Sequence, residues 1–484
     1  MGAGAHTAPD EAPELARVTA EELLLRYRRR EVSPVEVARA CLETIERYDE
    51  LVHAFCLTDP ERALASARES EARWRDGEPC GLLDGVPAAV KDVFLTAGWP
   101  TLRGFPVPAP GARWDVDAPP VAALRRHGAV IVGKTTTPQF GWKAVTDGPG
   151  VPPTCNPWDR ARTAGGSSGG SAAALALGMA PLAVGTDGGG SIRIPGAFCG
   201  IVGLKPTFAR VPQWPPSPFG LLAHSGPMAR TVTDTALLLD VLAEPDPREW
   251  AALPPTAGRY ADAVLDHGVA DVRIAFSPDL GHATVDPEVA AAVAAAAGAL
   301  TDLGARVEQV DPGFEDPRPA FDVLWSAGAA AAVAALTPDQ REHLDPGLAA
   351  LVERAAGLSA AALLEAQADR ARLGTAVGQF HADWDILLTP TVPIAAFEAG
   401  REVPEGWSDP HWPGWTPFTY PFNLTQQPAL TVPCGFTVQR RPIGLQIVGR
   451  RHAEALVLRV ARAYEARHPQ PTLANHPSCP GGLR

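Results

Sequence analysis

A chain of 484 residues is long enough for about three domains, although one large α/β domain also reaches this length. Hydrophobic residues make up 46% of the chain and supply an extensive core, and the net charge of −13 excludes the strongly basic surface that binds nucleic acid or anionic membranes. The composition therefore predicts an ordered globular protein whose partner is a small molecule.

The first residues carry no apolar stretch after a basic start, so segment 1–17 is expected to be flexible and to hold no export signal. From Val18 to about Arg75, apolar residues recur at helical spacing and predict helices. Ser33 followed by Pro34 is typical of a helix N-cap with proline at the first helical position. This part of the chain is expected to be scaffold.

From residue 85 the pattern changes to short apolar runs between glycines and prolines, which predict strands. These runs cover 86–94, 128–134 and 181–186, and helices are expected between them at Pro119–Arg126 and Ser171–Met179. An alternation of strands and helices is typical of the α/β class.

A second α/β stretch follows after residue 270. Its predicted strands are 272–281, 305–311, 384–393, 429–436 and 443–450, and its predicted helices are Pro287–Leu303, further helices to about Asp383, and Ala453–Ala466. A loop rich in tryptophan and proline spans 406–417. Because no repeat and no long linker is visible, the sequence predicts one domain over 18–470 and a C-terminal tail at 471–484.

Two further patterns bear on location and metal binding. The uncharged run 163–186 is long enough to span a bilayer, but its glycines, serines and Pro181 favour a buried helix and strand, so no membrane segment is expected. The seven cysteines include no C-x-x-C pair, and no H-E-x-x-H motif occurs. These features predict no metal site, no disulfide framework and a cytoplasmic location.

Two short motifs match known functional patterns, but the residues around them do not fit the structure that each pattern requires. Residues 128–135 read GAVIVGKT and match a phosphate-binding P-loop, but their centre is itself strand-like, whereas a P-loop requires a flexible loop followed by a helix. The run GGSSGG satisfies G-x-S-x-G for both Ser167 and Ser168, but no strand precedes it as a nucleophile elbow requires. Neither a nucleotide site nor an α/β-hydrolase is expected.

Three other segments carry residues suited to amide hydrolysis, which needs an activated hydroxyl, a proton acceptor and donors for an oxyanion. They are GVPAAVKD with Lys91, GGSSGGSAAA with Ser167, and GTDGGGSIRIPGAFCGIVGLKPT with Ser191. Taken singly, Lys91 suits an ion pair with Asp92, and each serine suits a turn without chemistry. Only four of the 42 basic residues are lysine, so a retained lysine is a candidate for an amine that must lose its proton.

Together the three segments resemble the amidase signature family, and the spacing of 24 residues between Ser167 and Ser191 is that of its two catalytic serines. The similarity extends to DILLTPTVP, PFNLTQQPALTVPCGF and PIGLQIVGR, so it covers nearly the whole chain. The resemblance implies an α/β fold in which a single large α/β/α domain has a central mixed β-sheet covered by helices. It also implies hydrolysis of C–N bonds without a metal or other cofactor.

The same resemblance implies a Ser–cis-Ser–Lys triad. Ser191 is the expected nucleophile, Ser167 bridges it to Lys91, and Lys91 acts as the base. An ordinary lysine has a pKa of about 10.4, so this role requires burial to lower the pKa of Lys91 towards neutrality. Asp187 and Arg193 are expected to stabilise the nucleophile loop. The expected oxyanion donors are the backbone N–H groups of Gly188, Gly189, Gly190 and Ser191.

Substrate contacts are predicted from the resemblance and from aromatic residues near the motifs. The candidates are Gln139, Phe140, Trp142, Phe219 and Trp415, with Trp214, Trp407 and Trp412 as further residues of an apolar entrance. They favour small hydrophobic amides, including aryl amides, esters or carbamates. The alternative is the glutaminase-like component of a tRNA-dependent amidotransferase, although Thr416 stands where those proteins carry an acidic residue. The oligomeric state is left open, with a homodimer as one alternative.

Overall fold

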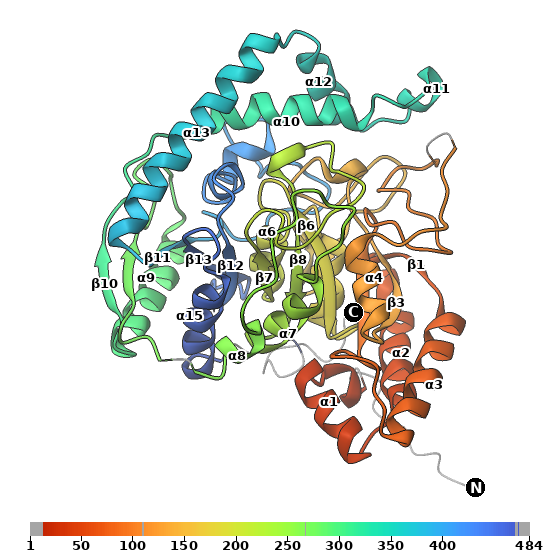
Figure 1. Cartoon of the computed structure of the whole chain (residues 1–484). Coiled ribbons are helices and arrows are strands. Elements are labelled where there is room, and N and C mark those ends of the chain that lie inside the picture. The colour runs from red at the N-terminus through yellow and green to blue at the C-terminus, as the bar shows by residue number, and fades with distance from the viewer. Residues whose placement is uncertain (1–12, 109–110, 267, 470–472, 474–484) are drawn as a thin grey trace, which may run out of the picture.

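The computed structural model describes residues 13–108, 111–266, 268–469 and 473. Within this part of the chain, a sheet of 11 strands crosses the molecule and is flanked by helices (Figure 1). Its strand order is β1-β3-β2-β6-β8-β7-β12-β13-β11-β9-β10, and a two-stranded ribbon, β4–β5, lies outside it. The expected large α/β domain with a central mixed sheet is confirmed.

The strands are short, and their directions are mixed. Strand β2 is parallel to β3 and β6, and β9 is parallel to β10 and β11, whereas β8 is antiparallel to β6 and β7, and β12 to β7 and β13. The bounds are β1 Phe55–Thr58, β2 Pro87–Lys91, β3 Val130–Thr135, β4 Cys155–Asn156, β5 Asp159–Thr163, β6 Leu182–Asp187, β7 Val202–Lys205, β8 His224–Ala229, β9 Arg273–Phe276, β10 Arg306–Gln309, β11 Ile386–Pro390, β12 Ala429–Phe436 and β13 Pro442–Gly449.

The helices precede, connect and cover these strands. The α-helices are α1 Ala20–Arg29, α2 Pro34–Val52, α3 Pro60–Asp76, α4 Pro119–Arg126, α5 Gly169–Leu177, α6 Arg193–Cys199, α7 Val232–Leu242, α8 Tyr260–Ala263, α9 Pro287–Asp302, α10 Arg318–Ala332, α11 Pro338–Arg341, α12 Pro346–Ala355, α13 Ala360–Asp383, α14 Pro421–Leu424 and α15 Glu454–Arg467. The 3-10 helices are η1 Glu14–Arg17, η2 Gln139–Gly141, η3 Gly220–Leu222 and η4 Trp412–Trp415.

Helices α10 to α13, residues 318–383, form a group that is called the cap below. Figure 1 shows the cap across the top of the view, with α13 running down one side of the sheet. None of the described helices by itself has the length and apolar composition of a membrane span. Helices α12 and α13 reach that length and apolar composition only when they are taken together, and the chain bends by 103° between them.

Most of the predicted elements are present. Helix α4 has the predicted bounds, Ser33 caps α2 in a capping box with Glu36, and the run GAVIVGKT ends in strand β3 rather than in a phosphate loop. The helix predicted from Ser171 starts two residues earlier, at Gly169. The predicted helical stretch 18–75 is interrupted by β1, because the pairing of β1 with β3 is a long-range contact that local periodicity does not reveal.

The predicted terminal segments lie largely outside the described residues. Of the segment 1–17, the structure describes residues 13–17, and Glu14–Arg17 forms η1, which lies against α2 and buries Ala16. The predicted boundary after residue 17 therefore falls in a packed part of the chain. Of the predicted tail 471–484, only residue 473 is described.

Candidate active site

The parallel strands β2 and β6 are neighbours, so their carboxyl ends lie at the same edge of the sheet. Lys91 is the last residue of β2, and its side chain is fully buried. Its Nζ lies 2.7 Å from Ser167 Oγ, 3.0 Å from Ser168 Oγ and 2.9 Å from Thr186 Oγ1 near the end of β6. The sheet topology thus brings Lys91 close to Thr186, and the contact of 2.7 Å places the Ser167 hydroxyl beside the same amine.

The alternative of an ion pair between Lys91 and Asp92 is wrong. The carboxylate of Asp92, which follows the last residue of β2, instead lies 2.6 Å from Lys134 Nζ on β3. Among the described residues, no carboxylate lies within ion-pair distance of Lys91.

Burial lowers the pKa of Lys91 well below its ordinary value, and the attraction of Asp187 opposes this shift only in part. The hydrogen bonds around the amine are consistent with a neutral lysine. The Ser168 hydroxyl donates to the backbone oxygen of Thr186 at 3.2 Å, so towards Lys91 it acts as an acceptor. In the structure the Lys91 amine donates to Ser167 Oγ at 2.7 Å, and the Ser167 hydroxyl has no second acceptor among the described residues, so it is able to donate its own proton to a neutral amine.

Ser167 lies on a loop that the preceding segment holds closely. The peptide bond between Gly166 and Ser167 is cis. A Cβ atom at Gly166 would lie 2.5 Å from the backbone carbon of Val145, so only glycine fits there. The Thr146 hydroxyl donates to the backbone oxygen of Gly165 at 2.9 Å and accepts from the N–H of Gly169 at 3.1 Å. These contacts fix the loop before α5 begins.

Ser191 follows β6 on the triple-glycine loop, and only 6% of its surface is exposed. The backbone oxygen of Ser191 accepts a hydrogen bond of 3.1 Å from the N–H of Ser168. This bond joins the nucleophile loop to the Ser167 loop. The three residues of the predicted triad are therefore gathered at one edge of the sheet.

The Asp187 side chain holds the triple-glycine loop that carries Ser191, the predicted nucleophile; this loop is called the nucleophile loop. Its carboxylate accepts from the backbone N–H of Gly190 at 2.8 Å and of Ile192 at 3.2 Å. Arg193 donates to both carboxylate oxygens at 2.9 Å, and both side chains are fully buried. Burial alone would raise the pKa of Asp187, but Arg193 outweighs it and holds the pKa below its usual range. The predicted structural role of this pair has a clear geometric basis.

One predicted oxyanion donor needs correction. The N–H of Gly190 is committed to Asp187, so it is unable to point towards a substrate at the same time. The N–H groups of Gly188, Gly189 and Ser191 have no hydrogen-bond acceptor among the described residues. These three groups are the ones left to stabilise an oxyanion.

Two of the predicted substrate-binding residues have structural roles instead. Gln139 is buried, donates to the backbone oxygen of His343 at 2.8 Å and accepts from the N–H of Asp345 at 2.7 Å, so its side chain is used up in holding the cap. Trp415 is fully buried, stacks on Phe198 at 5.8 Å between ring centres and donates to the backbone of Glu402. Neither side chain is available to a substrate.

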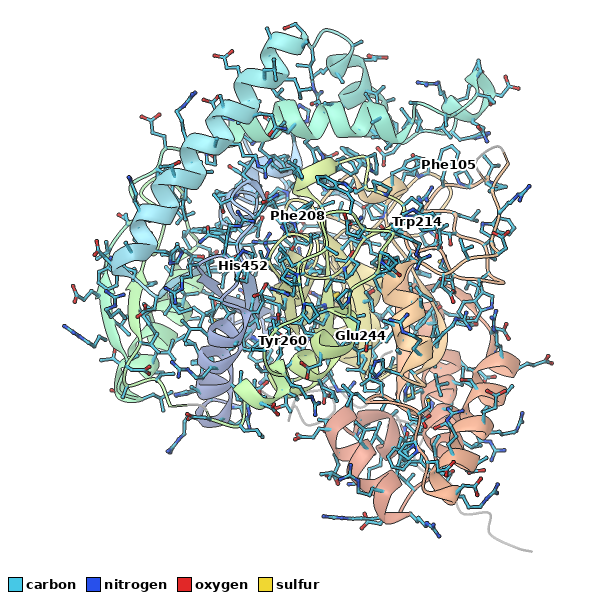
Figure 2. All side chains as sticks on the ribbon, in the orientation of Figure 1. Phe105, Phe208, Trp214, Glu244, Tyr260 and His452 are labelled. Atoms are coloured by element: carbon cyan, nitrogen blue, oxygen red, sulfur yellow. The ribbon has the colours of Figure 1, made fainter. Side chains whose placement is uncertain are left out.

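The other predicted contacts lie near the catalytic loops or the cap. Phe140 is half-buried, adopts a positive φ of 55° and contacts Phe105, which Figure 2 shows below the cap. Trp142 is buried and follows Gly141, where an added Cβ would lie 3.2 Å from Ser167 Oγ. Phe219 stacks on Trp325 of α10 with ring centres 4.0 Å apart.

Trp214 and Trp412 differ in their distance from the candidate site. Trp214 lies on the segment between β7 and β8 (Figure 2), where the Arg248 guanidinium sits 5.0 Å from its ring. Trp412 of η4 packs so closely on Gly189 that a Cβ there would lie 2.7 Å from the indole. Only Trp412 of the two therefore contacts the nucleophile loop.

Two aromatic residues of α10 were not among the predicted substrate contacts. Added Cβ atoms would lie 2.8 Å from Trp325 at Gly188 and 2.9 Å from Phe321 at Gly189. Phe321 and Trp325 are four residues apart and so share one helix face, which is the signal that could have identified them. That signal does not say which part of the molecule the face covers.

A cavity of about 360 Å³ lies on the cap side of these aromatic residues. Its lining includes the buried tryptophans Trp142, Trp325 and Trp412, together with Asp322, Arg354 and Glu402. The indole N–H of Trp142 is buried and has no hydrogen-bond partner among the described residues. The cavity is mainly apolar, with charged groups in its lining. Within the described ranges, His, Cys, Asp and Glu side chains form no group of three that could hold a metal ion.

Comparisons with known proteins show which family this chain is similar to. The sequence model of the family described as Amidase matches residues 36–458. The chain is 36% identical to an acylamidase of Rhodococcus erythropolis over 460 residues, which cover 93% of this chain and 96% of the relative.

Two further comparisons extend the range of similar proteins. The chain is 37% identical to the A component of the glutamyl-tRNA(Gln) amidotransferase of Picosynechococcus sp. over 476 residues, which cover 90% of this chain and 95% of that relative. Among solved structures, a bacterial aryl acylamidase superposes with a TM-score of 0.87 at 29% identity, over 94% of this chain and 97% of that one.

Proposed function

The chain belongs to the amidase signature family and is a hydrolase of C–N bonds, and from this we propose that it cleaves small hydrophobic amides through an acyl-enzyme on Ser191. One observation carries the proposal. Lys91 is fully buried, has three hydroxyl groups and no carboxylate around its amine among the described residues, and has its pKa lowered by burial. A neutral amine beside a serine hydroxyl is a suitable general base.

In the first step, the Ser167 hydroxyl passes its proton to Lys91 Nζ and takes the proton of Ser191 Oγ. The Ser191 oxygen forms a bond to the carbonyl carbon of the amide, and the C=O electron pair moves to the carbonyl oxygen. The N–H groups of Gly188, Gly189 and Ser191 stabilise the resulting oxyanion because no described acceptor of the protein occupies them.

In the second step, the oxyanion re-forms the C=O bond and the C–N bond breaks. The proton held by Lys91 returns through Ser167 to the leaving nitrogen, so the product departs as a neutral amine. Water then attacks the ester of Ser191 by the same route in reverse, which releases the acid and restores the serine. All proton transfers stay within the buried set of hydroxyls next to Lys91.

The aromatic residues around the nucleophile loop support a hydrophobic substrate. Trp325, Phe321 and Trp412 pack on Gly188 and Gly189, beside the proposed oxyanion donors. Each buried aromatic ring of a ligand contributes roughly 1.5–3 kcal/mol at the usual area coefficient. Aryl amides, aryl esters and carbamates are therefore the proposed substrate classes, and the proposed partner is a small molecule.

The second candidate function is that of the glutaminase-like component of a tRNA-dependent amidotransferase, and the identity to such a protein favours it. Glutamine carries an ammonium group that needs a buried negative partner, since an unpaired buried charge costs several kcal/mol. Thr416, at the position considered for that partner, is fully buried and donates its hydroxyl to the backbone of Pro413. Its neutral hydroxyl argues against glutamine as the substrate.

Covalent labelling tests the proposed nucleophile. A fluorophosphonate probe should form a phosphonate ester with Ser191 Oγ and release fluoride, and Ser191→Ala should lose both labelling and turnover while remaining folded. Ser66→Ala on α3, outside the catalytic loops, serves as the matched control and should behave like the parent protein. Labelling at Ser168, or turnover retained by Ser191→Ala, would contradict the assignment.

A further inference from the structure

Residues 139–146, called the bridging segment below, connect the Ser167 loop with the cap. On the side of the candidate site, Gly141 has a positive φ of 72° and leaves little room for a side chain, because a Cβ would lie 3.2 Å from Ser167 Oγ and in contact with Lys91 Nζ at 4.0 Å. Further along, the backbone of Val145 packs on Gly166, and Thr146 bonds to the backbone on both sides of Ser167. The position of the bridging segment thus sets the space around the proposed base.

On its other side, the bridging segment is bonded to the cap at three points. Gln139 forms two hydrogen bonds with the backbone of residues 343 and 345. The indole N–H of Trp325 on α10 donates to the backbone oxygen of Trp142 at 3.0 Å. The third point is an ion pair between Lys143 Nζ and Asp345 Oδ2 at 2.8 Å.

The ion pair is buried and charged. Lys143 also lies next to Asp147, and although burial alone would lower the pKa of Lys143, the two carboxylates outweigh it and raise the pKa. Glu402 is a further acidic group close enough to interact with Lys143. A buried amine with these neighbours stays protonated, so Asp345 contributes an electrostatic attraction that water screens little.

We propose that Asp345 is a positioning residue for the proposed acyl-enzyme chemistry: through Lys143 it holds the bridging segment against Ser167 and Lys91. The inference rests on the proposed function of those two residues. A bridging segment drawn away from the Ser167 loop would admit water to Lys91, and hydration favours the charged amine. It would also displace the Ser167 hydroxyl, and displacements of about 1 Å cost up to roughly 100-fold in rate.

The test uses Asp345→Asn in the full chain. Asp345 is also the N-cap of α12, where its carboxylate accepts from the N–H of Gly347, and asparagine caps a helix equally well. The substitution therefore removes the ion pair and keeps the cap. We expect kcat to fall roughly 10- to 100-fold with little change in KM. We also expect the rising limb of the kcat–pH profile to move to higher pH, because Lys91 is less desolvated.

Asp369→Asn on α13 is the matched control, because it removes an exposed ion pair with Arg372 from the cap without contacting the bridging segment. A second variant, Gln139→Met, breaks another tie to the cap and should move the same limb in the same direction. Asp187 is the charged group that acts on Lys91, and none of these variants changes it.

An Asp345→Asn protein that melts earlier but keeps the parent kcat and pH limb would show a purely structural role and overturn the proposal. So would an equal shift in Asp369→Asn. The rate of fluorophosphonate labelling, measured against pH, should show the same rise with pH and needs no amide substrate. If the parent protein is not labelled at Ser191 at all, the proposed function fails, and this outcome is distinct from a failure of the positioning role.

Discussion

At the scale of single residues, the four lysines are all buried, but their neighbours differ. Lys134 and Lys143 lie within 3 Å of carboxylates. The carboxylates raise the pKa of Lys143, whereas burial outweighs Asp92 at Lys134 and lowers its pKa. Lys205 donates to the backbone oxygens of Pro206 and Gln427, and Lys134 donates to the Thr101 hydroxyl beside its carboxylate partner. Of the four, Lys91 is the lysine with serine hydroxyls around its amine. Burial lowers the pKa of Lys91, Lys134 and Lys205, so the serine hydroxyls, together with the lack of a carboxylate at ion-pair distance among the described residues, distinguish Lys91 as the candidate base.

The pH dependence of activity tests this distinction. Because the neutral amine is the active form, the rate should rise as pH increases through the pKa of Lys91, at a pH below the ordinary lysine range. Lys91→Arg should be inactive across the whole range, since a guanidinium does not lose its proton. Rates measured from acid to alkaline pH with an amide substrate provide the check, and an active arginine variant would exclude the role of base.

The buried pair of Asp187 and Arg193 leads to a prediction about stability. Asp187→Asn leaves the Arg193 charge without its partner, and breaking a buried pair in this way costs about 3–5 kcal/mol in unfolding free energy. The folded-state pKa of Asp187 lies below the usual carboxyl value. Its contribution is therefore present above the unfolded-state pKa and is lost as pH falls through the folded-state pKa.

Urea unfolding at several pH values measures this effect. The difference between parent and Asp187→Asn should be largest near neutral pH and shrink in acid. Asp302→Asn at the exposed end of α9 is the control and should leave the unfolding free energy nearly unchanged. Equal stability of Asp187→Asn and the parent at neutral pH would show that the pair is not needed.

At the scale of elements, strands β2 and β6 position residues of the candidate active site. Each is buried along nearly its whole length, and each ends in a polar residue of the site, Lys91 and Asp187. Their parallel pairing places both ends at one edge of the sheet. Ligand sites at the carboxyl ends of strands are the general rule for open α/β sheets.

Helix α2 begins where the capping residues Ser33 and Pro34 predicted a helix start. The Ser33 hydroxyl accepts from the N–H of Glu36, and the Glu36 carboxylate accepts from the N–H of Ser33, with Pro34 at the first helical position. Ser33→Ala should lower the unfolding free energy by about 1 kcal/mol without changing kcat or KM, because α2 lies outside the catalytic loops. Thermal or urea unfolding beside an activity assay measures both quantities, and a reduced kcat would contradict the scaffold role.

At the scale of the whole molecule, the cap and the sheet both contribute residues to the proposed substrate region. Phe321 and Trp325 come from the cap, Trp412 from η4, and the glycine loop from the sheet edge. Substrate selection is therefore expected to depend on how the cap sits on the sheet. An apolar wall of this kind discriminates against a compact zwitterion.

A substrate panel tests this at the level of the complete protein. The purified chain, without other proteins, should hydrolyse hydrophobic anilides, aryl esters or carbamates with a higher kcat/KM than glutamine or asparagine. The physical reason is the burial of apolar surface on the substrate against the tryptophans and the lack of a negative charge on Thr416. Efficient glutamine hydrolysis together with no activity on several aromatic amides would overturn the proposed substrate class.

Local patterns in the amino-acid chain were enough to define the main elements, and the resemblance to the amidase signature family supplied the set of catalytic candidates. The helix at Pro119–Arg126, the capped start of α2 and the buried strands follow from capping residues and short apolar runs, which are local properties of the chain. That resemblance rests chiefly on the segments that carry Lys91, Ser167 and Ser191. No local pattern predicted β1, because an edge strand of four residues depends on its partner β3.

The neighbours of each candidate became known only from the folded arrangement. In the folded chain, Gln139 bonds to the cap and Trp415 is fully buried. The N–H of Gly190 donates to Asp187, and Trp325 packs against Gly188. Several of these contacts join residues more than 100 positions apart. The direction of a side chain or of an N–H group across such distances is set by packing of whole elements, and periodicity, capping and motif spacing carry no information about it.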